Sequence, residues 1–356
     1  MTSRQGKMLA IDGSFGEGGG QVLRTALALS AVTKTPVRVE NIRLRRPKPG
    51  LQAQHLTCIK AVGELCNAEV SGLSLGSAEV TFHPGDIAGG TFSFDVGTAG
   101  SMTLVLQALL PPALHAPDQV EISLSGGTDV AWSPPVDYFK RVLLPLIGKA
   151  GCLVDLEVVK RGYYPHGGGV LRAVVHSIQQ PHRIALEERG ILKGIEGVSH
   201  ASYDIKDRSV AERQNKGARM CLFNELSKRS ISVQPNLAEE YSETHSTGSG
   251  LTLWTVYSNT LLGASALGEK SKKAEDVGSE AAQHLMSEID AGAAVDSHMA
   301  DQILPYLALF GGVVRVPAVP ALSQHAKTNI HVINQFGFNL KVEGNVVKSD
   351  GWHLEK

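Results

Sequence analysis

The sequence predicts an α/β (α+β) fold in which one unit occurs three times and a small α/β domain is inserted. Each copy begins with a turn of small residues, continues with an apolar helical run, and ends in a strand. These runs start at Gly18, Ala99 and Asp301. A repeated layout of this kind favours sheets that pack against helices around a shared core.

A second helix is expected after the first helix and strand of each copy. Its apolar residues recur at steps of three and four, which is the spacing of one helical face. The positions are Leu56, Ile59, Val62 and Cys66 in the first copy, Phe139, Val142, Leu143 and Leu146 in the second, and Ala326, Ile330 and Ile333 in the third. Each of these segments leads into a turn and another strand.

The third copy is displaced along the chain by an inserted segment. Between about Glu187 and Gly292 the pattern predicts a strand, a helix, three strands and a helix. The polar stretch Glu239–Gly250 is predicted to be a surface loop. We therefore expect a catalytic repeat domain at residues 1–185 and 293–356, with the inserted domain at 186–292 between the second and third copies.

Composition limits the classes of function. The 356 residues carry a formal net charge of −1, so a polyanion would be held by a local basic cluster. The four cysteines are far apart and form no CxxC pair, which argues against disulfides or a cysteine zinc site. The amino-terminal segment lacks the apolar centre of a signal peptide, and the apolar run Leu104–Leu114 is too short to span a bilayer. A soluble, cytoplasmic protein without membrane contact is expected.

The segment Gly13–Arg24 places a glycine cluster where a strand passes into a helix. Glycine allows close approach of the backbone, and amides at a helix start attract phosphate. Glu17 could hold a divalent metal, and Arg24 could pair with phosphate oxygens. A plain tight turn with a solvated glutamate explains the same residues equally well.

A dense basic cluster occurs in the segment Ile42–Leu56, which two prolines stiffen. Guanidinium groups suit phosphate better than lysine does. A charge run is usually a solvated face, but this position before a helix favours an anion site. The basic residues of the cluster are Arg43, Arg45, Arg46 and Lys48, and Gln54 and His55 open the helix that follows.

His325 begins the last predicted helix and is the candidate nucleophile. A lone histidine there is most often a cap or a surface residue. Its polar surroundings exceed what a cap requires, however: Ser323, Gln324, Thr328 and Asn329. Asp301 opens the third copy, where a helix start also favours an acid. Gln107 lies in an apolar helix, where burial without a partner would be costly.

Together these motifs resemble the RNA 3′-terminal phosphate cyclase family, nearly from end to end. The matching strings are DGSFGEGGGQVLR, IRLRRPKPGLQAQHL, GTAGSMTLVLQ, SGGTD, RGYYPHGGG, HMADQ and HAKTN. The resemblance implies three repeats as in enolpyruvyl-transferase-like folds, plus a thioredoxin-like insert. It also implies ATP-dependent conversion of an RNA 3′-terminal phosphate to a 2′,3′-cyclic phosphate, through a histidine–AMP intermediate and an RNA adenylate.

The resemblance implies a role for each matching residue. His325 would be the adenylated residue, and Glu17 would hold Mg or Mn. Residues that would bind RNA or phosphate are Arg24, Arg43, Arg46, Gln54 and His55. Residues that would bind ATP are Gln107, Pro134, His298, Met299, Ala300, Asp301 and Gln302. The chain has His298 where bacterial members carry tyrosine, which bears on adenine selectivity.

Two other classes of protein share the predicted fold. A cyclase-like ribosome-biogenesis protein would act without catalysis in rRNA processing, but such proteins lack the histidine present here as His325. An enolpyruvyl transferase has a two-fold set of repeats and no adenylated residue. Catalysis is therefore the favoured hypothesis, with RNA ending in a 3′-phosphate as partner, while the sequence indicates no protein partner.

Overall fold

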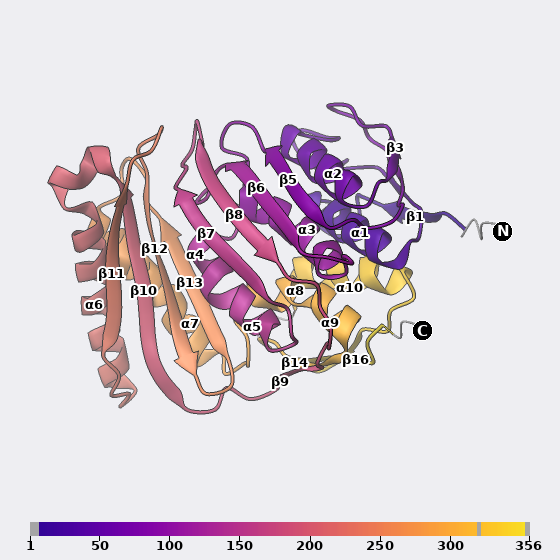
Figure 1. The fold of residues 1–356 in the computed structure, drawn as a ribbon. Coiled ribbons are helices and arrows are strands. Elements are labelled where there is room, and N and C mark those ends of the chain that lie inside the picture. Colours follow the sequence, from indigo (N-terminus) through magenta and orange to yellow (C-terminus); the bar gives the residue numbers. More distant parts are fainter. Residues whose placement is uncertain (1–6, 319–321, 353–356) are drawn as a thin grey trace.

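The computed structural model describes residues 7–318 and 322–352, and it confirms the mixed α/β class (Figure 1). Its first unit comprises β1 (Leu9–Asp12), α1 (Gly20–Thr33), β2 (Val37–Glu40), α2 (Ala53–Leu65), β3 (Glu69–Ser71) and β4 (Val80–His83). Its second unit comprises β5 (Gly90–Asp95), α3 (Met102–Leu114), β6 (Val120–Gly126), α4 (Val136–Tyr138), η1 (Phe139–Leu143), α5 (Leu144–Gly148), β7 (Val154–Lys160) and β8 (Gly169–Val175).

The third unit surrounds the insertion. It comprises β9 (Ile184–Leu186), α8 (Met299–Gln302), α9 (Leu304–Phe310), β14 (Gly312–Arg315), α10 (Gln324–Gln335), β15 (Lys341–Glu343) and β16 (Val346–Ser349). Because β9 pairs in parallel with β14, the first strand of this unit precedes the insertion. The insertion thus lies inside the third unit, and not between the second and third units as the sequence suggested. The strand β9 has three residues, too few to show a pattern.

All three units have the same sheet topology. In each sheet the first two strands are parallel, the fourth strand is antiparallel to the second, and the third pairs on the outside of the fourth. The orders are β1-β2-β4-β3, β5-β6-β8-β7 and β9-β14-β16-β15. The threefold repetition expected from the sequence is therefore present in the backbone pairing.

The inserted segment has its own sheet and core. It comprises β10 (Leu192–Ser202), η2 (Tyr203–Arg208), α6 (Val210–Lys228), β11 (Pro235–Ser242), β12 (Ser249–Tyr257), β13 (Leu261–Leu267) and α7 (Ala274–Asp290). The sheet has the order β11-β10-β12-β13, and α6 and α7 pack together against it. A separate cluster of buried apolar side chains fills the space between them. The domain limits of 186 and 292 stay a prediction.

One segment of the insertion differs from expectation. The stretch 239–250 was predicted to be a loop, but β11 extends to Ser242 and β12 begins at Ser249. The strand β11 lies at the edge of its sheet, and four of its eight residues are exposed. Charged residues are usual on such an edge strand, so its polar end resembles a loop in the sequence.

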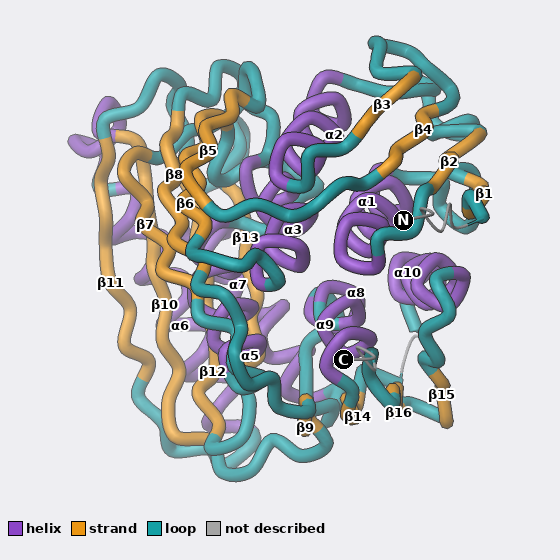
Figure 2. Tube along the Cα trace, turned by 45° about the vertical axis from the view of Figure 1, so that its right-hand side comes forward, coloured by secondary structure: helices purple, strands orange, loops and turns teal. Residues whose placement is uncertain are grey.

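The helices of the repeats gather between the sheets. The helix α1 contacts α2, α3 and α10, and α10 also contacts α9 (Figure 2). Since α1 is covered on nearly all sides, most of its residues are buried. This packing brings the starts of α1, α8 and α10 together, although α1 begins 279 residues before α8 and 304 residues before α10.

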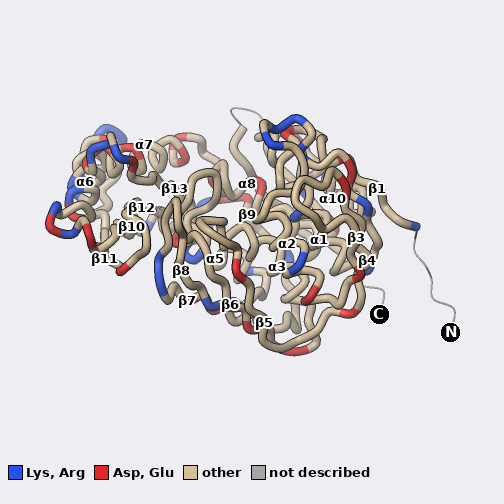
Figure 3. The backbone as a smooth tube through the Cα atoms, turned by 90° about the horizontal axis from the view of Figure 1, so that it is seen from above, with Lys and Arg blue, Asp and Glu red and all other residues tan. Residues whose placement is uncertain are grey.

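Charged residues of both signs are distributed along the chain. In the backbone trace, positions of lysine and arginine and positions of aspartate and glutamate occur in both the inserted segment and the repeats (Figure 3), and the net charge is −1. Within residues 7–318 and 322–352, no helix combines the length and the apolar character that crossing a membrane requires.

Candidate active site

His325 lies at the amino-terminal end of α10, as predicted. The helix is capped by Ser323, whose Oγ accepts a hydrogen bond from the backbone N of Ala326 at 3.0 Å. The imidazole itself is 48% exposed. The ring therefore stands at an open surface where a large substrate can reach it.

Two side chains hold the ring of His325 in place. Its Nδ1 is 2.9 Å from Oε1 of Gln21, and Nε2 of Gln21 donates to Oδ2 of Asp301 at 2.7 Å. Because the Gln21 amide donates to the carboxylate, its oxygen faces the imidazole and Nδ1 carries the proton. The other nitrogen, Nε2, is then free to act as a nucleophile unless it is also protonated.

Asp301 is half-buried at the start of α8 and supports this arrangement. Burial raises its pKa to about 6, although the charges of His325, His298 and Arg24 oppose that rise. Asn329 adds to the same group: its Nδ2 donates to the Asp301 carbonyl at 2.9 Å, and its Oδ1 accepts from Thr25 at 2.6 Å. The contacts join the first unit to the third.

Glu17 lies directly against the free nitrogen of His325. Its Oε2 is 3.1 Å from Nε2 of His325 and 3.3 Å from Nη2 of Arg46. All three groups are more than a third exposed, so water screens their mutual attraction. A carboxylate, an imidazole and a guanidinium thus lie close together, but the contacts between them are weak.

The glycine loop brings its backbone against basic side chains. Gly20 begins α1, and a Cβ there would collide with Nε2 of His55 and crowd Nη1 of Arg24 at 3.1 Å. Gly16 has φ +61°, and a Cβ there would collide with Oγ1 of Thr328. The absence of side chains lets the loop pass between the α2 and α10 starts, which is the property the sequence predicted.

His55 lies in the site as a neutral group. Its Nδ1 accepts from the backbone N of Gln52 at 3.0 Å, which forms part of the cap of α2. Burial, with the charges of Arg24 and Arg43 nearby, lowers its pKa to about 3. Arg24 is half-buried beside it; burial lowers its pKa although Cys58 and Asp301 oppose this, and the guanidinium still stays charged.

Two of the predicted phosphate-binding residues already have partners in the fold. Nε and Nη2 of Arg43 donate to the carbonyl of Lys48 at 3.3 and 3.1 Å, within their own loop. Burial and the charge of Arg46 lower the pKa of Arg43. Oε1 of Gln54 accepts from the backbone N of Ser101 at 3.2 Å, at the cap of α3. Both side chains stabilise the loops around the site.

Residues expected to bind ATP come from three elements. Nε2 of Gln107 on α3 donates to Oε1 of Gln302 on α8 at 2.8 Å. The carbonyl of Pro134 accepts from Oγ1 of Thr103 at 2.8 Å. His298 is exposed just before α8, with its ring edge toward Tyr138. The side chains of Met299 and Ala300 are buried in the core, so only their backbone can face a ligand.

Gln21 and Thr25 on α1 and Asp296 before α8 also belong to the site and were not expected from the sequence. Oδ1 of Asp296 accepts from the backbone N of His298 at 3.0 Å and from the Tyr138 hydroxyl at 2.7 Å, which fixes the start of α8. The signal for Gln21 and Thr25 was present, since both are polar residues in an otherwise apolar helix. The cost of burying a polar side chain in an apolar helix had identified only Gln107.

This geometry defines a class of site: an imidazole beside one carboxylate, next to a glycine loop and two arginines. Such groups suit the transfer of a phosphoryl or nucleotidyl group. The RNA 3′-terminal phosphate cyclase family model matches residues 15–343. The chain therefore belongs to the RNA 3′-terminal phosphate cyclase family.

Curated relatives agree with this assignment. The chain is 48% identical over 341 residues to the RNA 3′-terminal phosphate cyclase of Archaeoglobus fulgidus, covering 96% of this chain and 99% of the relative. It is 47% identical over 330 residues to the RNA 3′-terminal phosphate cyclase of Hyperthermus butylicus, covering 92% and 90%. The names of these relatives agree with the enzyme class expected from the sequence, an RNA 3′-terminal phosphate cyclase.

Among solved structures, the enolpyruvyl transferase NikO from Streptomyces tendae matches with a TM-score of 0.27 and 11% identity. The match covers 98% of this chain and 66% of NikO. A score this low does not by itself support a shared architecture, and the fold class is established by the sheet topology of the chain itself.

Proposed function

We propose that the chain uses ATP to convert an RNA 3′-terminal phosphate into a 2′,3′-cyclic phosphate, with His325 as the adenylated residue. The observation that carries the proposal is the orientation of His325. Its Nδ1 is occupied by Gln21, while Nε2 lies 3.1 Å from Oε2 of Glu17 on a ring that is 48% exposed. An imidazole held in this way has a defined nucleophilic atom.

The proposed chemistry has three steps. Nε2 of His325 attacks the α-phosphorus of ATP, and pyrophosphate leaves. An oxygen of the RNA 3′-phosphate then attacks the histidine-bound AMP, which releases the imidazole and gives an RNA adenylate. Finally the ribose 2′-oxygen attacks the activated phosphorus, loses its proton, and expels AMP. Adenylation supplies the leaving group that a phosphate monoester dianion lacks.

Residues of the chain would bind and orient these groups. Glu17 is a hard oxygen donor that fits a divalent metal, Mg or Mn, which would neutralise charge on the triphosphate when bound. Arg24 and Arg46 would bind phosphate, and neutral His55 would donate a hydrogen bond from Nε2. The ATP group would lie against Pro134, Gln107 and the segment 298–302. The free state of all four cysteines supports the expected cytoplasmic location.

The test is covalent labelling. Incubation of the protein with ATP labelled at the α-phosphate and a divalent metal should give protein-bound label that acid removes. His325→Ala should abolish that label. His331→Ala is the matched control, because this histidine lies on the same helix and stacks on Phe15 at 3.7 Å. Label that resists acid, or that survives His325→Ala, would refute the proposal.

Substrate specificity gives a second test. RNA with a 3′-phosphate should be cyclised, whereas RNA with a 3′-hydroxyl should not react. An RNA whose terminal ribose lacks the 2′-hydroxyl should stop as the adenylate, since the last step has no nucleophile. Cyclisation without ATP would contradict the sequence of steps.

A further inference from the structure

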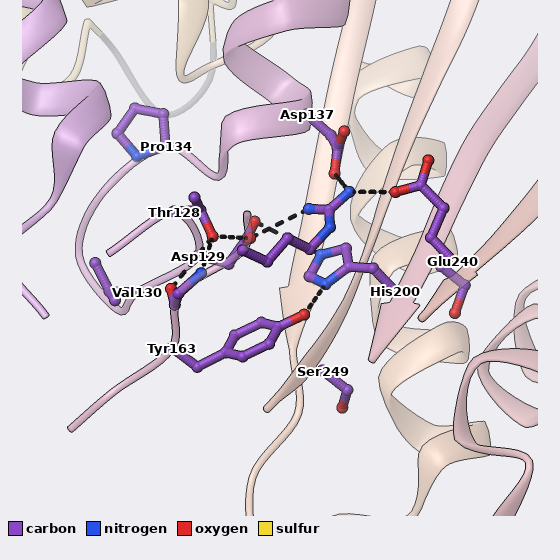
Figure 4. A network of polar contacts seen from close by, with 12 residues as sticks. Thr128, Asp129, Val130, Pro134, Asp137, Tyr163, His200, Glu240 and Ser249 are labelled. Atoms are coloured by element: carbon purple, nitrogen blue, oxygen red, sulfur yellow. Dashed lines mark hydrogen bonds and ion pairs between the residues drawn. The ribbon is translucent and has the colours of Figure 1, made fainter. Parts of the chain in front are cut away.

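A second polar cluster lies between the second unit and the inserted segment, apart from His325. Asp129 follows β6, Asp137 lies on α4, and His200 lies on β10 (Figure 4). All three side chains are at most 7% exposed. One oxygen or nitrogen from each lies within 4.8 Å of the others, and within the part of the chain that the structure describes this is the one such group. These are ligand types that metal ions use.

The three atoms that meet here have no hydrogen-bond partner. They are Oδ1 of Asp129, Oδ2 of Asp137 and Nε2 of His200, and all are buried. Oδ1 of Asp129 is 3.5 Å from Nε2 of His200, and Oδ2 of Asp137 contacts Arg161 only out of hydrogen-bond alignment. A buried polar atom without a partner is costly. Three such atoms in one buried cluster indicate a missing ligand.

The formal charges of the cluster do not balance. Arg161 is its guanidinium, with Nη1 at 3.2 Å from Oδ2 of Asp129 and Nη2 at 2.8 Å from both Asp137 and Glu240. Asp129 and Asp137 are buried and formally carry two negative charges against this one guanidinium, while the side chain of Glu240 is 50% exposed. Buried charge is expensive unless it is paired. A cation at the cluster would pair the remaining buried charge.

His200 is oriented as a ligand. Its Nδ1 is 2.8 Å from the hydroxyl of Tyr163, and the two rings stack with centroids 5.8 Å apart. This contact occupies Nδ1 and leaves Nε2 directed at the carboxylates. Ligating histidines commonly have their second nitrogen fixed by such a partner.

A pocket lies beside one of the three residues. It has a volume of about 660 Å³ and is lined by Asp137, Arg161 and Glu240, and also by Lys140 and Lys160. Asp129 and His200 lie behind it and are almost fully buried.

We propose that Asp129, Asp137 and His200 bind one divalent transition-metal ion, which fastens the inserted segment to the second unit. An imidazole with two carboxylates suits zinc or manganese, whereas magnesium prefers oxygen ligands alone. The ion holds β10 against the loop between β6 and α4. This site is distinct from the metal position proposed at Glu17, and it does not depend on the proposed reaction.

The test counts metal in the full chain. The Glu17→Gln variant, which removes the proposed position near His325, is stripped with a chelator, loaded with Zn²⁺, desalted and analysed by mass spectrometry. One zinc per chain is expected, with a raised Tm. Adding His200→Gln should weaken zinc binding about 10- to 100-fold. The matched control is His176→Gln, because His176 lies 3.0 Å from Asp155 at the surface, where an isolated pair should bind no ion tightly.

Cobalt provides a second readout that does not depend on folding of the His200→Gln variant. Co²⁺ added to the stripped Glu17→Gln chain should give a visible absorption spectrum of nitrogen and oxygen ligation that zinc displaces. Less than about 0.2 zinc per chain, no such spectrum, or unchanged zinc affinity in folded His200→Gln would each overturn the site. None of these results touches adenylation of His325, which labelled ATP measures separately.

Discussion

The two charged clusters of this molecule differ in their contact with water. At the His325 site, the side chains of Glu17 and Arg46 are 39% and 36% exposed. In the other cluster, Arg161 and Asp129 are 3% and 0% exposed. Similar chemical groups thus have opposite roles. Glu17 and Arg46, which are exposed, can exchange each other for a phosphate or a metal ion. In the buried cluster, loss of one charged partner would leave an unpaired charge in the interior.

The electrostatics follow from this difference. Burial alone would lower the pKa of Arg161, but the charges of Asp137 and Asp129 raise it well above its ordinary value. Glu17 and Arg46 are held by one contact at 3.3 Å, which water weakens. Weak ion pairs within the site favour binding of a polyanion, because the polyanion then has to replace only weak contacts between the protein's own side chains. A junction between two parts of a fold benefits from strong pairing.

The largest expected effect is on stability. Arg161→Met should lower the free energy of unfolding by about 3–5 kcal/mol, because it leaves the buried carboxylates of Asp129 and Asp137 without their cation. Arg46→Met should lower it by less than about 1 kcal/mol, since that arginine is exposed. Urea unfolding of both variants measures the comparison. Equal losses of unfolding free energy in the two variants would show that burial does not make the Arg161 ion pairs more important for stability than the Arg46 ion pair.

The next effect is on catalysis at the exposed site. Glu17→Gln should slow adenylation of His325 by about 100-fold or more, because the metal loses its carboxylate ligand. The free energy of unfolding should stay within about 0.5 kcal/mol of the parent. Rates are measured with labelled ATP over a range of Mg²⁺ and Mn²⁺ concentrations.

The control for Glu17→Gln is Glu40→Gln on β2, which removes an acid whose partner is Arg38, outside the site. Adenylation in that variant should be unchanged. A normal rate in Glu17→Gln at low metal concentration would remove Glu17 from the metal site.

A smaller effect concerns pH and Asp301. Its pKa of about 6 lies above the ordinary 3.8, so the native chain holds the proton more tightly than the unfolded chain. The free energy of unfolding should therefore fall as pH rises from about 4 to about 7, by on the order of 2 kcal/mol. Asp301→Asn should lack this fall, and unfolding of both proteins across that range measures it. If the free energy of unfolding changed with pH in the same way in both proteins, the pKa of Asp301 would not be raised by folding.

Much of the fold could be predicted because the repeats carry a helical period. The helix α10, for example, keeps Ala326 and Ile333 on its buried face. The strand β9 could not be predicted, since three residues show no pattern and its partner β14 is more than 100 residues away. Pairing over such distances is determined by tertiary contacts that local sequence does not express.

The site shows the same division between local and distant information. His325, Glu17 and Arg46 stand in local motifs and were named from them. The contact between Gln21 and Asp301 links residues 280 positions apart, and no motif contains both. The buried cluster at Arg161 was hidden for the same reason: its members come from separate segments, and Glu240 was assigned to a loop.

The smallest effect separates the two arginines of the basic loop. Arg46→Ala should raise KM for RNA with a 3′-phosphate about 10-fold, because Arg46 lies beside Glu17 and its guanidinium is free to turn toward phosphate. Arg43→Ala should raise it about threefold, since Arg43 already donates twice to the carbonyl of Lys48 and acts mainly by shaping the loop. Arg43→Lys should restore less than Arg46→Lys, because an ammonium cannot reproduce a fork of donors to one carbonyl. KM for each variant is measured at two salt concentrations. The increase in KM caused by Arg46→Ala should be smaller at high salt. A larger KM change in Arg43→Ala than in Arg46→Ala would show that the loop arginine, and not the one beside Glu17, contacts the RNA phosphate.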